Sequence, residues 1–327
     1  MKHRRLGKTQ VMVSEIAMGC WQLGGKWGDP FNPLLAEETL QAAVDNGINC
    51  FDTADVYIGG ESERAIGRFL PKIPGDVFVI TKIGRWLNPH TAEGYNEDNL
   101  RAFIDQSRRN LGVEALDMVL LHCPPFEVYY MPEVFASLDA MKKEGKIKHY
   151  GVSVQKVEEG LMALEYPGVE AVEIIFNMFR LRPAELFFQE AKKKDVGVIV
   201  RVPLASGLLT GKFTHETTFG QEDHREVNRQ GAWFDRGETF SGVEYTSGLE
   251  AVEALKAVFP DTPLLLIALR WILMFDAVST IIPGASRPEQ IIQNAKAVEL
   301  PPLTSEQMEQ VEAIYNRFIK AQVHHRW

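Results

Sequence analysis

Cysteine is scarce in this sequence, and its scarcity limits the classes of protein that the chain can encode. Only Cys20, Cys50 and Cys123 occur, they lie far apart, and no C-x-x-C spacing is present. An odd number of isolated cysteines argues against the disulfide framework of a small secreted protein. We therefore expect a cytoplasmic protein.

A long hydrophobic run is also missing, which argues against a membrane-spanning segment. The most apolar stretch, 263–275, is interrupted by Arg270 and is too short to cross a bilayer, so it predicts a buried helix. The basic residues 1–5 are followed by the polar residues 7–10 and not by the apolar region of a signal peptide. We expect no membrane partner.

Positive charge is in deficit. The 35 Lys and Arg residues are outnumbered by 44 Asp and Glu residues, which gives a net charge of -9. Such a surface repels nucleic acid and anionic lipid, so an anionic ligand needs a local basic site. The hydrophobic fraction of 45% and the charged fraction of 24% are typical of a globular protein.

The sequence has no G-x-G-x-x-G loop, which is the dinucleotide-binding signature of doubly wound sheets. What it has is an alternation of short apolar runs with amphipathic patterns, which predicts a parallel sheet with helices between the strands. Eight such units favour a single (β/α)8 TIM barrel domain over residues 1–327, with an open sheet as the alternative. The expected strands are Ile16–Cys20, Asn49–Asp52, Val77–Thr81, Asp117–Leu121, Ile147–Val152, Ala171–Phe176, Val196–Arg201 and Val278–Ile282.

Four of the helical patterns are each followed by a glycine in the position of a helix C-terminal stop. The patterns are Ala36–Asn46, Glu97–Leu111, Val134–Glu144 and Pro183–Lys194, and the glycines are Gly47, Gly112, Gly145 and Gly197.

Three additions to a minimal barrel are expected. A hairpin of Arg4–Leu6 and Val11–Val13 would cover the barrel's bottom, and a long segment, 205–247, would lie at the C-terminal mouth. The tail after Leu300 continues as a helix, and His324 and His325 near its end predict a frayed terminus.

Four reactive side chains fall at or just after the ends of consecutive predicted strands. Asp52 ends the second strand, with Tyr57 shortly after it, while Lys82 and His122 follow the third and fourth. In a barrel these ends meet at one mouth, so the four predict a single acid–base site. An ammonium about 4 Å from a tyrosine hydroxyl stabilises the phenolate by roughly 4 kcal/mol at an effective dielectric of about 20. The Tyr57 pKa would then fall by at most about three units, with Asp52 offsetting part of the effect.

Several ordered motifs resemble those of the aldo-keto reductase family, in particular its bacterial members and the potassium-channel beta-subunit branch. The block GINCFDTADVY at 47–57 is the most specific of them, and the resemblance extends over essentially the whole chain. The remaining motifs are 80–82 (ITK), 120–122 (LLH), 151–153 (GVS), 203–212 (PLASGLLTGK) and 282–294 (IPGASRPEQIIQN).

The resemblance implies NADP(H)-dependent reduction of a small aldehyde or ketone, with no metal, by a protein that acts as a monomer. Tyr57 would donate the proton, supported by Asp52, Lys82 and His122, and the cofactor would lie across the barrel mouth. The residues implied to bind the cofactor are Cys20, Trp21, Asp52, Ser153, Glu173, Arg201, Pro203, Leu204, Ser206, Gly207, Leu209, Lys212, Gly284, Ser286, Arg287, Gln290, Gln293 and Asn294.

Three positions depart from the family pattern. Val154 stands where Asn is frequent, Glu173 where a carboxamide-binding Gln is frequent, and Arg201 where an aromatic residue stacks on nicotinamide. A guanidinium plane also stacks on a ring, and Glu173 would pair with it. The preference for NADP(H) rests on Ser286 and Arg287 ahead of a helix that starts at Pro288.

Two other functions remain open at this stage. One is a non-catalytic, NADP-binding regulatory subunit of the same fold, which would not need the acid. The other is a lyase or isomerase with Lys82 as a Schiff-base amine, for which an ionised lysine is a poor nucleophile. The aromatic residues Trp21, Trp27, Trp86, Tyr129 and Tyr130 are candidates for a substrate wall, but the sequence names no substrate.

Overall fold

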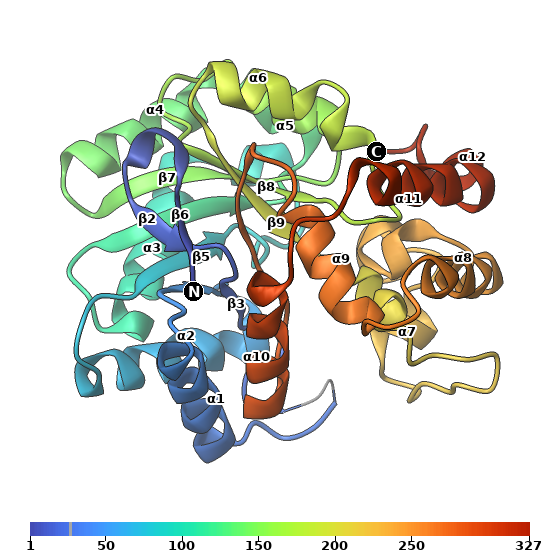
Figure 1. Ribbon diagram of the computed structural model, residues 1–327. Coiled ribbons are helices and arrows are strands. Elements are labelled where there is room, and N and C mark those ends of the chain that lie inside the picture. The colour runs from blue at the N-terminus through green and yellow to red at the C-terminus, as the bar shows by residue number, and fades with distance from the viewer. Residues whose placement is uncertain (26–27) are drawn as a thin grey trace.

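The computed structural model describes residues 1–25 and 28–327. Eight strands form one parallel sheet in which neighbours in space are neighbours in sequence (Figure 1). The strands are β3 (Met18–Gly19), β4 (Cys50–Asp52), β5 (Phe78–Ile83), β6 (Leu116–His122), β7 (Ile147–Ser153), β8 (Ala171–Ile175), β9 (Gly197–Arg201) and β10 (Val278–Ile281).

The sheet closes on itself, which decides between a barrel and an open sheet. Parallel bridges join Ile16 to Ile281 and Gly19 to Gly284, and the Ala17 N–H donates to the Ile281 carbonyl at 2.8 Å. The eight-stranded barrel expected from the sequence is confirmed.

Helices surround the barrel and extend beyond it (Figure 1). Those that follow the strands or extend the chain after them are α1 (Pro33–Asp45), α2 (Glu61–Phe69), α3 (Glu97–Leu111), α4 (Pro132–Lys143), α5 (Val157–Ala163), α6 (Phe187–Lys193), α7 (His224–Val227), α8 (Tyr245–Val258), α9 (Leu264–Ile272), α10 (Pro288–Ala295), α11 (Ser305–Phe318) and α12 (Lys320–Val323). No helix in the described part of the chain is long and apolar enough to cross a membrane.

Helix ends follow local chemistry, with one exception. The Asn96 side chain accepts a hydrogen bond from the Asn99 N–H at the start of α3, and Gly112 ends that helix with φ 68°. After α6, however, the left-handed residue is Asp195, with φ 53°, while Gly197 belongs to β9. The prediction of Gly197 as a helix stop was therefore wrong.

Gly197 is required by the hairpin that precedes the barrel. Strands β1 (His3–Arg5) and β2 (Met12–Ser14) pair antiparallel, and the turn between them inserts Leu6 into the barrel's interior cluster. A Cβ at position 197 would lie 2.6 Å from the Leu6 side chain. The expected covering of the barrel bottom is confirmed, and the glycine serves close packing.

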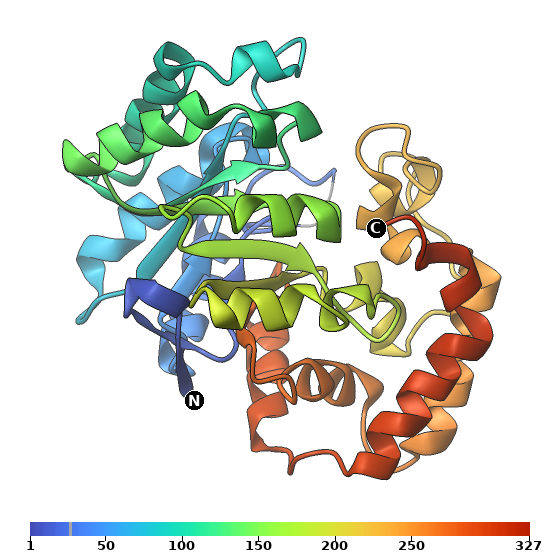
Figure 2. The same cartoon turned by 90° about the horizontal axis from the view of Figure 1, so that it is seen from above.

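The tail of the chain packs firmly on the long segment 205–247. Figure 2 shows α11 beside α8, with the C-terminus next to that segment. The His324 ring contacts the Tyr315 hydroxyl at 2.8 Å and Glu185 at 3.0 Å, and Trp327 is buried. The expectation of a frayed end was wrong for this part of the tail, because long-range contacts hold it.

Candidate active site

The site caps the apolar interior of the barrel, and strand periodicity explains why. Cys50, Ile80, Leu120, Ala171 and Ile199 form the interior cluster. Side chains two residues apart on a strand share a face, so each of these strands points its next interior side chain toward the mouth. These next side chains are Asp52, Lys82, His122, Glu173 and Arg201.

Lys82 is the charge at the centre of the site. Its ammonium donates to the Asp52 carboxylate at 2.6 Å, to the Thr53 carbonyl at 3.0 Å and to the Tyr57 hydroxyl at 3.3 Å. A second carboxylate, Glu173, lies 3.5 Å away. Burial alone lowers the pKa of Lys82, but Asp52 and Glu173 together raise it above its ordinary value. Lys82 is therefore an ammonium at neutral pH and not a nucleophilic amine.

Tyr57 begins a 3-10 turn, Tyr57–Gly60, directly after the loop that leaves β4. Burial raises the pKa of its hydroxyl above the ordinary value, and Lys82 opposes that rise. Asp52 and Glu173 add to it, so the one ammonium is outweighed. The sequence-based expectation of a net lowering is corrected here: Lys82 acts in the expected direction, but desolvation is larger.

His122 faces Tyr57 edge-on, with 5.9 Å between ring centroids. Burial holds the pKa of His122 well below its ordinary value, and the nearby cations Arg85, Lys82 and Arg201 lower it further. The ring is therefore neutral at pH 7 and carries a single N–H.

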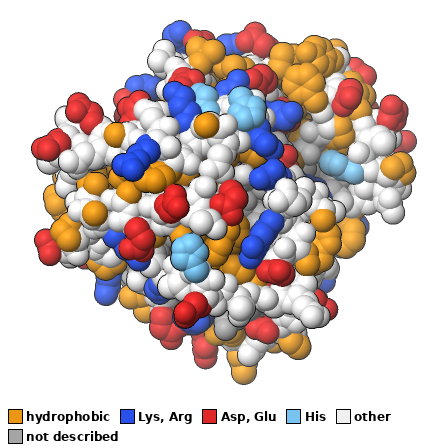
Figure 3. Space-filling model, turned by 90° about the vertical axis from the view of Figure 1, so that its right-hand side faces the viewer, with side chains coloured by type: hydrophobic (Ala, Val, Ile, Leu, Met, Phe, Trp, Pro, Cys, Tyr) orange, Lys and Arg blue, Asp and Glu red, His pale blue; other side chains and the backbone are white. Residues whose placement is uncertain are grey.

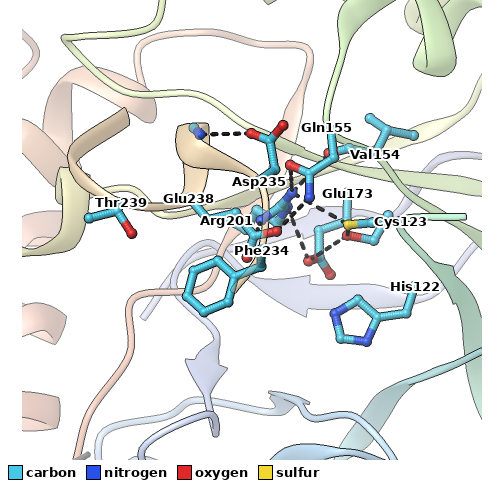
Figure 4. A network of polar contacts seen from close by, with 12 residues as sticks. His122, Cys123, Val154, Gln155, Glu173, Arg201, Phe234, Asp235, Glu238 and Thr239 are labelled. Carbon is cyan, nitrogen blue, oxygen red and sulfur yellow. Dashed lines mark hydrogen bonds and ion pairs between the residues drawn. The ribbon is translucent and has the colours of Figure 1, made fainter. Parts of the chain in front are cut away.

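The structure brings Glu173 and Arg201 together, though not closely. Their nearest charged atoms are 3.9 Å apart. Arg201 is buried and donates through one nitrogen to the Val154 carbonyl at 3.0 Å and to the Gln155 side chain at 2.9 Å (Figure 4). Ser153 donates to Glu173 at 3.1 Å. Glu173 thus joins the Lys82 charge cluster to Arg201.

A cavity of about 810 Å³ extends from Tyr57 and His122 to the N-terminal half of α10. That volume lies within the usual range of ligand and cofactor pockets. Figure 3 shows the face of the molecule that carries segment 205–247, with Lys and Arg side chains gathered near its middle. The residues implied to bind the cofactor that line this cavity are Trp21, Asp52, Glu173, Arg201, Pro203, Leu204, Ser206, Gly207, Lys212, Gly284, Arg287, Gln290, Gln293 and Asn294.

Four implied cofactor contacts do not line the cavity: Cys20, Ser153, Leu209 and Ser286 are buried behind it. Ser153 is engaged by Glu173, and the Ser286 hydroxyl donates to Gln290 at 3.2 Å. These residues orient the wall rather than form it. Lys82 also lies behind the wall and contacts the cavity through Tyr57 and Asp52.

The far end of the cavity is an exposed rim at the start of α10. Pro288 is the first helical residue, as expected, and Arg287 precedes it. The Arg287 side chain is 51% exposed and lies 3.5 Å from the Glu289 carboxylate. Lys212 and Arg225, from segment 205–247, line the same cavity.

Several lining residues carried no signal in the sequence. Glu238 pairs with Arg85 at 3.1 Å and with Arg201 at 3.6 Å, and its segment joins the site only through the fold. Of the aromatic candidates, Trp21 lines the cavity, Tyr129 belongs to the core, and Trp86 and Tyr130 are exposed elsewhere. Trp27 lies outside the described residues.

Two buried polar atoms at the reactive end lack a hydrogen-bond partner. Neither His122 Nδ1 nor Asp52 Oδ2 has a hydrogen-bond partner among the described residues. Such atoms are unusual in a folded protein unless a ligand or water satisfies them. The donor set, the cavity and the basic rim therefore fit a nicotinamide dinucleotide.

Comparison with known proteins agrees with this geometry. An oxidoreductase of Bacillus subtilis, YqkF, is 28% identical over 318 residues and covers 96% of both chains. The NADH-specific methylglyoxal reductase of Escherichia coli is 28% identical over 92% of this chain and 94% of its own. Among solved structures, the glycerol dehydrogenase of Gluconobacter oxydans superposes with a TM-score of 0.79 at 26% identity, covering 97% and 96% of the two chains. A holo aldo-keto reductase of Bacillus halodurans gives 0.77 at 25% identity, with 96% of each chain covered.

The family model described as the aldo/keto reductase family matches residues 15–316, which is nearly the whole chain. With the closed barrel and the Asp52, Tyr57, Lys82 and His122 cluster at its mouth, this match places the chain in the aldo/keto reductase family.

Proposed function

We propose that this protein is an NADP(H)-dependent reductase that converts an aldehyde or ketone to an alcohol, with Tyr57 as the proton donor. The observation that carries the proposal is the contact of the Lys82 ammonium with both the Asp52 carboxylate and the Tyr57 hydroxyl, at 2.6 and 3.3 Å. A lysine held in this way supports a phenolate that forms during the reaction.

The bound cofactor supplies the hydride, and the residues of this chain handle the proton. Tyr57 gives its phenolic proton to the substrate oxygen, and Lys82 stabilises the phenolate that remains. Asp52 fixes the ammonium in place and keeps it charged. Neutral His122 donates its one N–H to the same substrate oxygen, which orients the carbonyl for attack.

The choice of NADP(H) is supported by the rim of the cavity. A 2′-phosphate carries close to two negative charges, and Arg287 offers a guanidinium at the N-terminus of α10, the positive end of the helix dipole. The Escherichia coli relative is NADH-specific by name, so relatives differ in this property. We also propose that the protein acts in the cytoplasm, where its three unpaired cysteines would remain reduced.

The test is NADPH oxidation with 4-nitrobenzaldehyde by the wild type and by Tyr57→Phe. Loss of the acid is expected to lower kcat by about 10²–10⁴-fold. The variant keeps the ring, so cofactor affinity, measured by quenching of intrinsic fluorescence, is expected to stay within about twofold. A wild type without turnover of any carbonyl would favour a cofactor-binding regulator instead, and a variant with near-normal turnover would remove Tyr57 from its role.

A further inference from the structure

Glu238 brings a carboxylate into the reactive end of the cavity from outside the barrel. It ends a short 3-10 turn, Arg236–Glu238, in segment 205–247. Its oxygens reach Arg85 at 3.1 Å and Arg201 at 3.6 Å, and one of them also accepts a hydrogen bond from the Gln155 amide (Figure 4). These two arginines hold the pKa of Glu238 below its usual value despite burial, so the group is ionised.

This carboxylate completes a charge balance that the barrel alone leaves open. At the reactive end Lys82 contacts Asp52 and Glu173, and Arg201 lies 3.9 Å from Glu173, whereas Arg85 pairs with Glu238. Without Glu238, Arg85 would have no carboxylate partner among the described residues. On a protein of net charge -9, a guanidinium without a carboxylate partner is a local site for an anion.

The two arginines differ in how far a ligand can reach them, because the Arg201 side chain is 9% exposed and the Arg85 side chain 24%. Arg201 is buried and its engaged nitrogen serves Val154 and Gln155. Arg85 has 24% of its side chain exposed, and its guanidinium donates to Glu238 at 3.1 Å and to the His122 carbonyl at 3.4 Å. A guanidinium has five donors, so Arg85 has donors left to face a ligand in the cavity that it lines.

The turn that carries Glu238 is held by the chain's tail and by the barrel mouth, where the Ser206 hydroxyl donates to the Glu238 carbonyl at 2.9 Å. The Trp327 ring nitrogen donates to Asp235 at 3.0 Å, and the Arg180 guanidinium stacks on the Trp327 ring at 4.6 Å. Gly242 leaves the space for this ring, since a Cβ there would lie 2.2 Å from it. Glu238 is 19% exposed and its segment lies outside the barrel strands, so loss of its contact with Arg85 would leave the strands in place.

We propose that Glu238 occupies the place of a substrate carboxylate, and that the substrates of this enzyme are oxo acids whose carboxylate replaces Glu238 on Arg85. This inference rests on the proposed function and adds the substrate class to it. In the reaction the carbonyl carbon gains the hydride from the reduced cofactor and the carbonyl oxygen gains the proton from Tyr57. The product is a hydroxy acid whose carboxylate is unchanged and remains paired with Arg85.

The experiment compares each acid with its neutral methyl ester in the presence of NADPH. The pairs are 4-carboxybenzaldehyde with methyl 4-formylbenzoate, and 4-oxobutanoate with methyl 4-oxobutanoate, so that two spacer lengths are sampled. The readout is the ratio of kcat/KM for acid to that for ester. It is measured in the wild type, in Arg85→Gln, in Glu238→Gln and in the control Arg5→Gln, whose partner Asp195 lies at the opposite end of the barrel.

For at least one pair we expect the wild type to prefer the acid. Arg85→Gln should lower the acid-to-ester ratio by about 10- to 100-fold, the size of a charge-assisted hydrogen-bonded pair. Glu238→Gln should lower KM for the acid several-fold, because the internal competitor has lost its charge. Arg5→Gln should leave the ratio as in the wild type.

A wild type that favours the esters in both pairs would overturn the substrate class, as would an Arg85→Gln variant that loses acid and ester activity by the same factor. Both results leave the proposed reductase function standing, because the esters and 4-nitrobenzaldehyde report on it separately. Absence of turnover with every carbonyl would overturn the reductase function and this inference with it.

Discussion

The two ends of the cavity hold ion pairs of the same chemistry in opposite surroundings. At the reactive end Lys82 and Asp52 meet at 2.6 Å with side chains that are 1% and 3% exposed. At the rim Arg287 and Glu289 are 3.5 Å apart and 51% and 74% exposed. Water and salt screen the Arg287–Glu289 pair, but they do not reach the buried Lys82–Asp52 pair. The inner pair is therefore part of the fold, and the outer pair can give way to a ligand.

This difference assigns different tasks to the two ends. A buried ion pair is costly to break, since removal of one partner leaves an uncompensated charge in the interior. An exposed pair contributes about 0–1 kcal/mol, so a ligand phosphate can take the place of Glu289 at little expense in stability. Under the proposed function, chemistry would be fixed at one end and recognition would be adjustable at the other.

The largest expected effect is at the inner pair. Lys82→Met leaves the buried carboxylates Asp52 and Glu173 without their cation, so the free energy of unfolding in urea should fall by about 3–5 kcal/mol. The double variant Lys82→Met/Asp52→Asn removes one of the two charges and should recover part of that loss. A single variant as stable as the wild type would show that the inner pair is not part of the fold.

A smaller effect concerns the pH dependence of the reaction. Burial raises the Tyr57 pKa above its ordinary value of about 10, so the acid stays protonated through neutral and mildly alkaline pH. Because the pKa of His122 is held well below its ordinary value, no inflection is expected near pH 6.5. We expect kcat/KM for reduction to show no loss assignable to Tyr57 between about pH 7 and 9.

Asp55 requires a control in that measurement. Asp55 precedes Tyr57 by two residues and is buried. Its burial, together with the charge of Glu63, raises its pKa to about 8. Asp55→Asn removes this titration, so a feature near pH 8 that disappears in the variant belongs to Asp55. A fall of kcat/KM with rising pH that begins below pH 9 and persists in Asp55→Asn would contradict the raised Tyr57 pKa.

The smallest effect is expected at the rim. With Arg287 half exposed, Arg287→Ala should reduce the preference for NADPH over NADH by only about 2- to 5-fold. Glu289→Gln should increase that preference by a similar factor, because the competing carboxylate is gone. Fluorescence titration of both cofactors at low and high salt measures the two changes. An unchanged preference in both variants would place the 2′-phosphate elsewhere.

The sequence predicted what depends on short-range periodicity. The strand end at Asp52 and the bounds of α3 follow from strand and helix patterns and from capping, which are local properties. The sequence could not predict whether the Tyr57 pKa is raised or lowered overall, because that depends on how completely the fold removes water from the hydroxyl. The approach of Leu6 to Gly197 also depends on residues far apart in the chain.

The same limit applies to the residues that the sequence did not reveal. Glu238 and Trp327 enter the site region through segment 205–247 and the tail, where no periodic pattern exists to place them. Glu173 was found only by resemblance, although the spacing of two from Ala171 in β8 marks it as an interior side chain at the mouth. Strand alternation in each predicted strand is therefore a usable signal for such residues.

Closure of the barrel has a consequence for synthesis of the chain on the ribosome. The Ala17 N–H donates to the Ile281 carbonyl, and these residues lie 264 positions apart in the sequence. At roughly 5–20 residues per second, the first strand waits on the order of 10–50 s for its last neighbour to emerge. Its unpaired edge is available to other chains for that time, and such edges are sites of aggregation. We therefore expect recovery of folded protein from cells to depend on translation speed and on chaperone supply more than on the stability of the finished barrel.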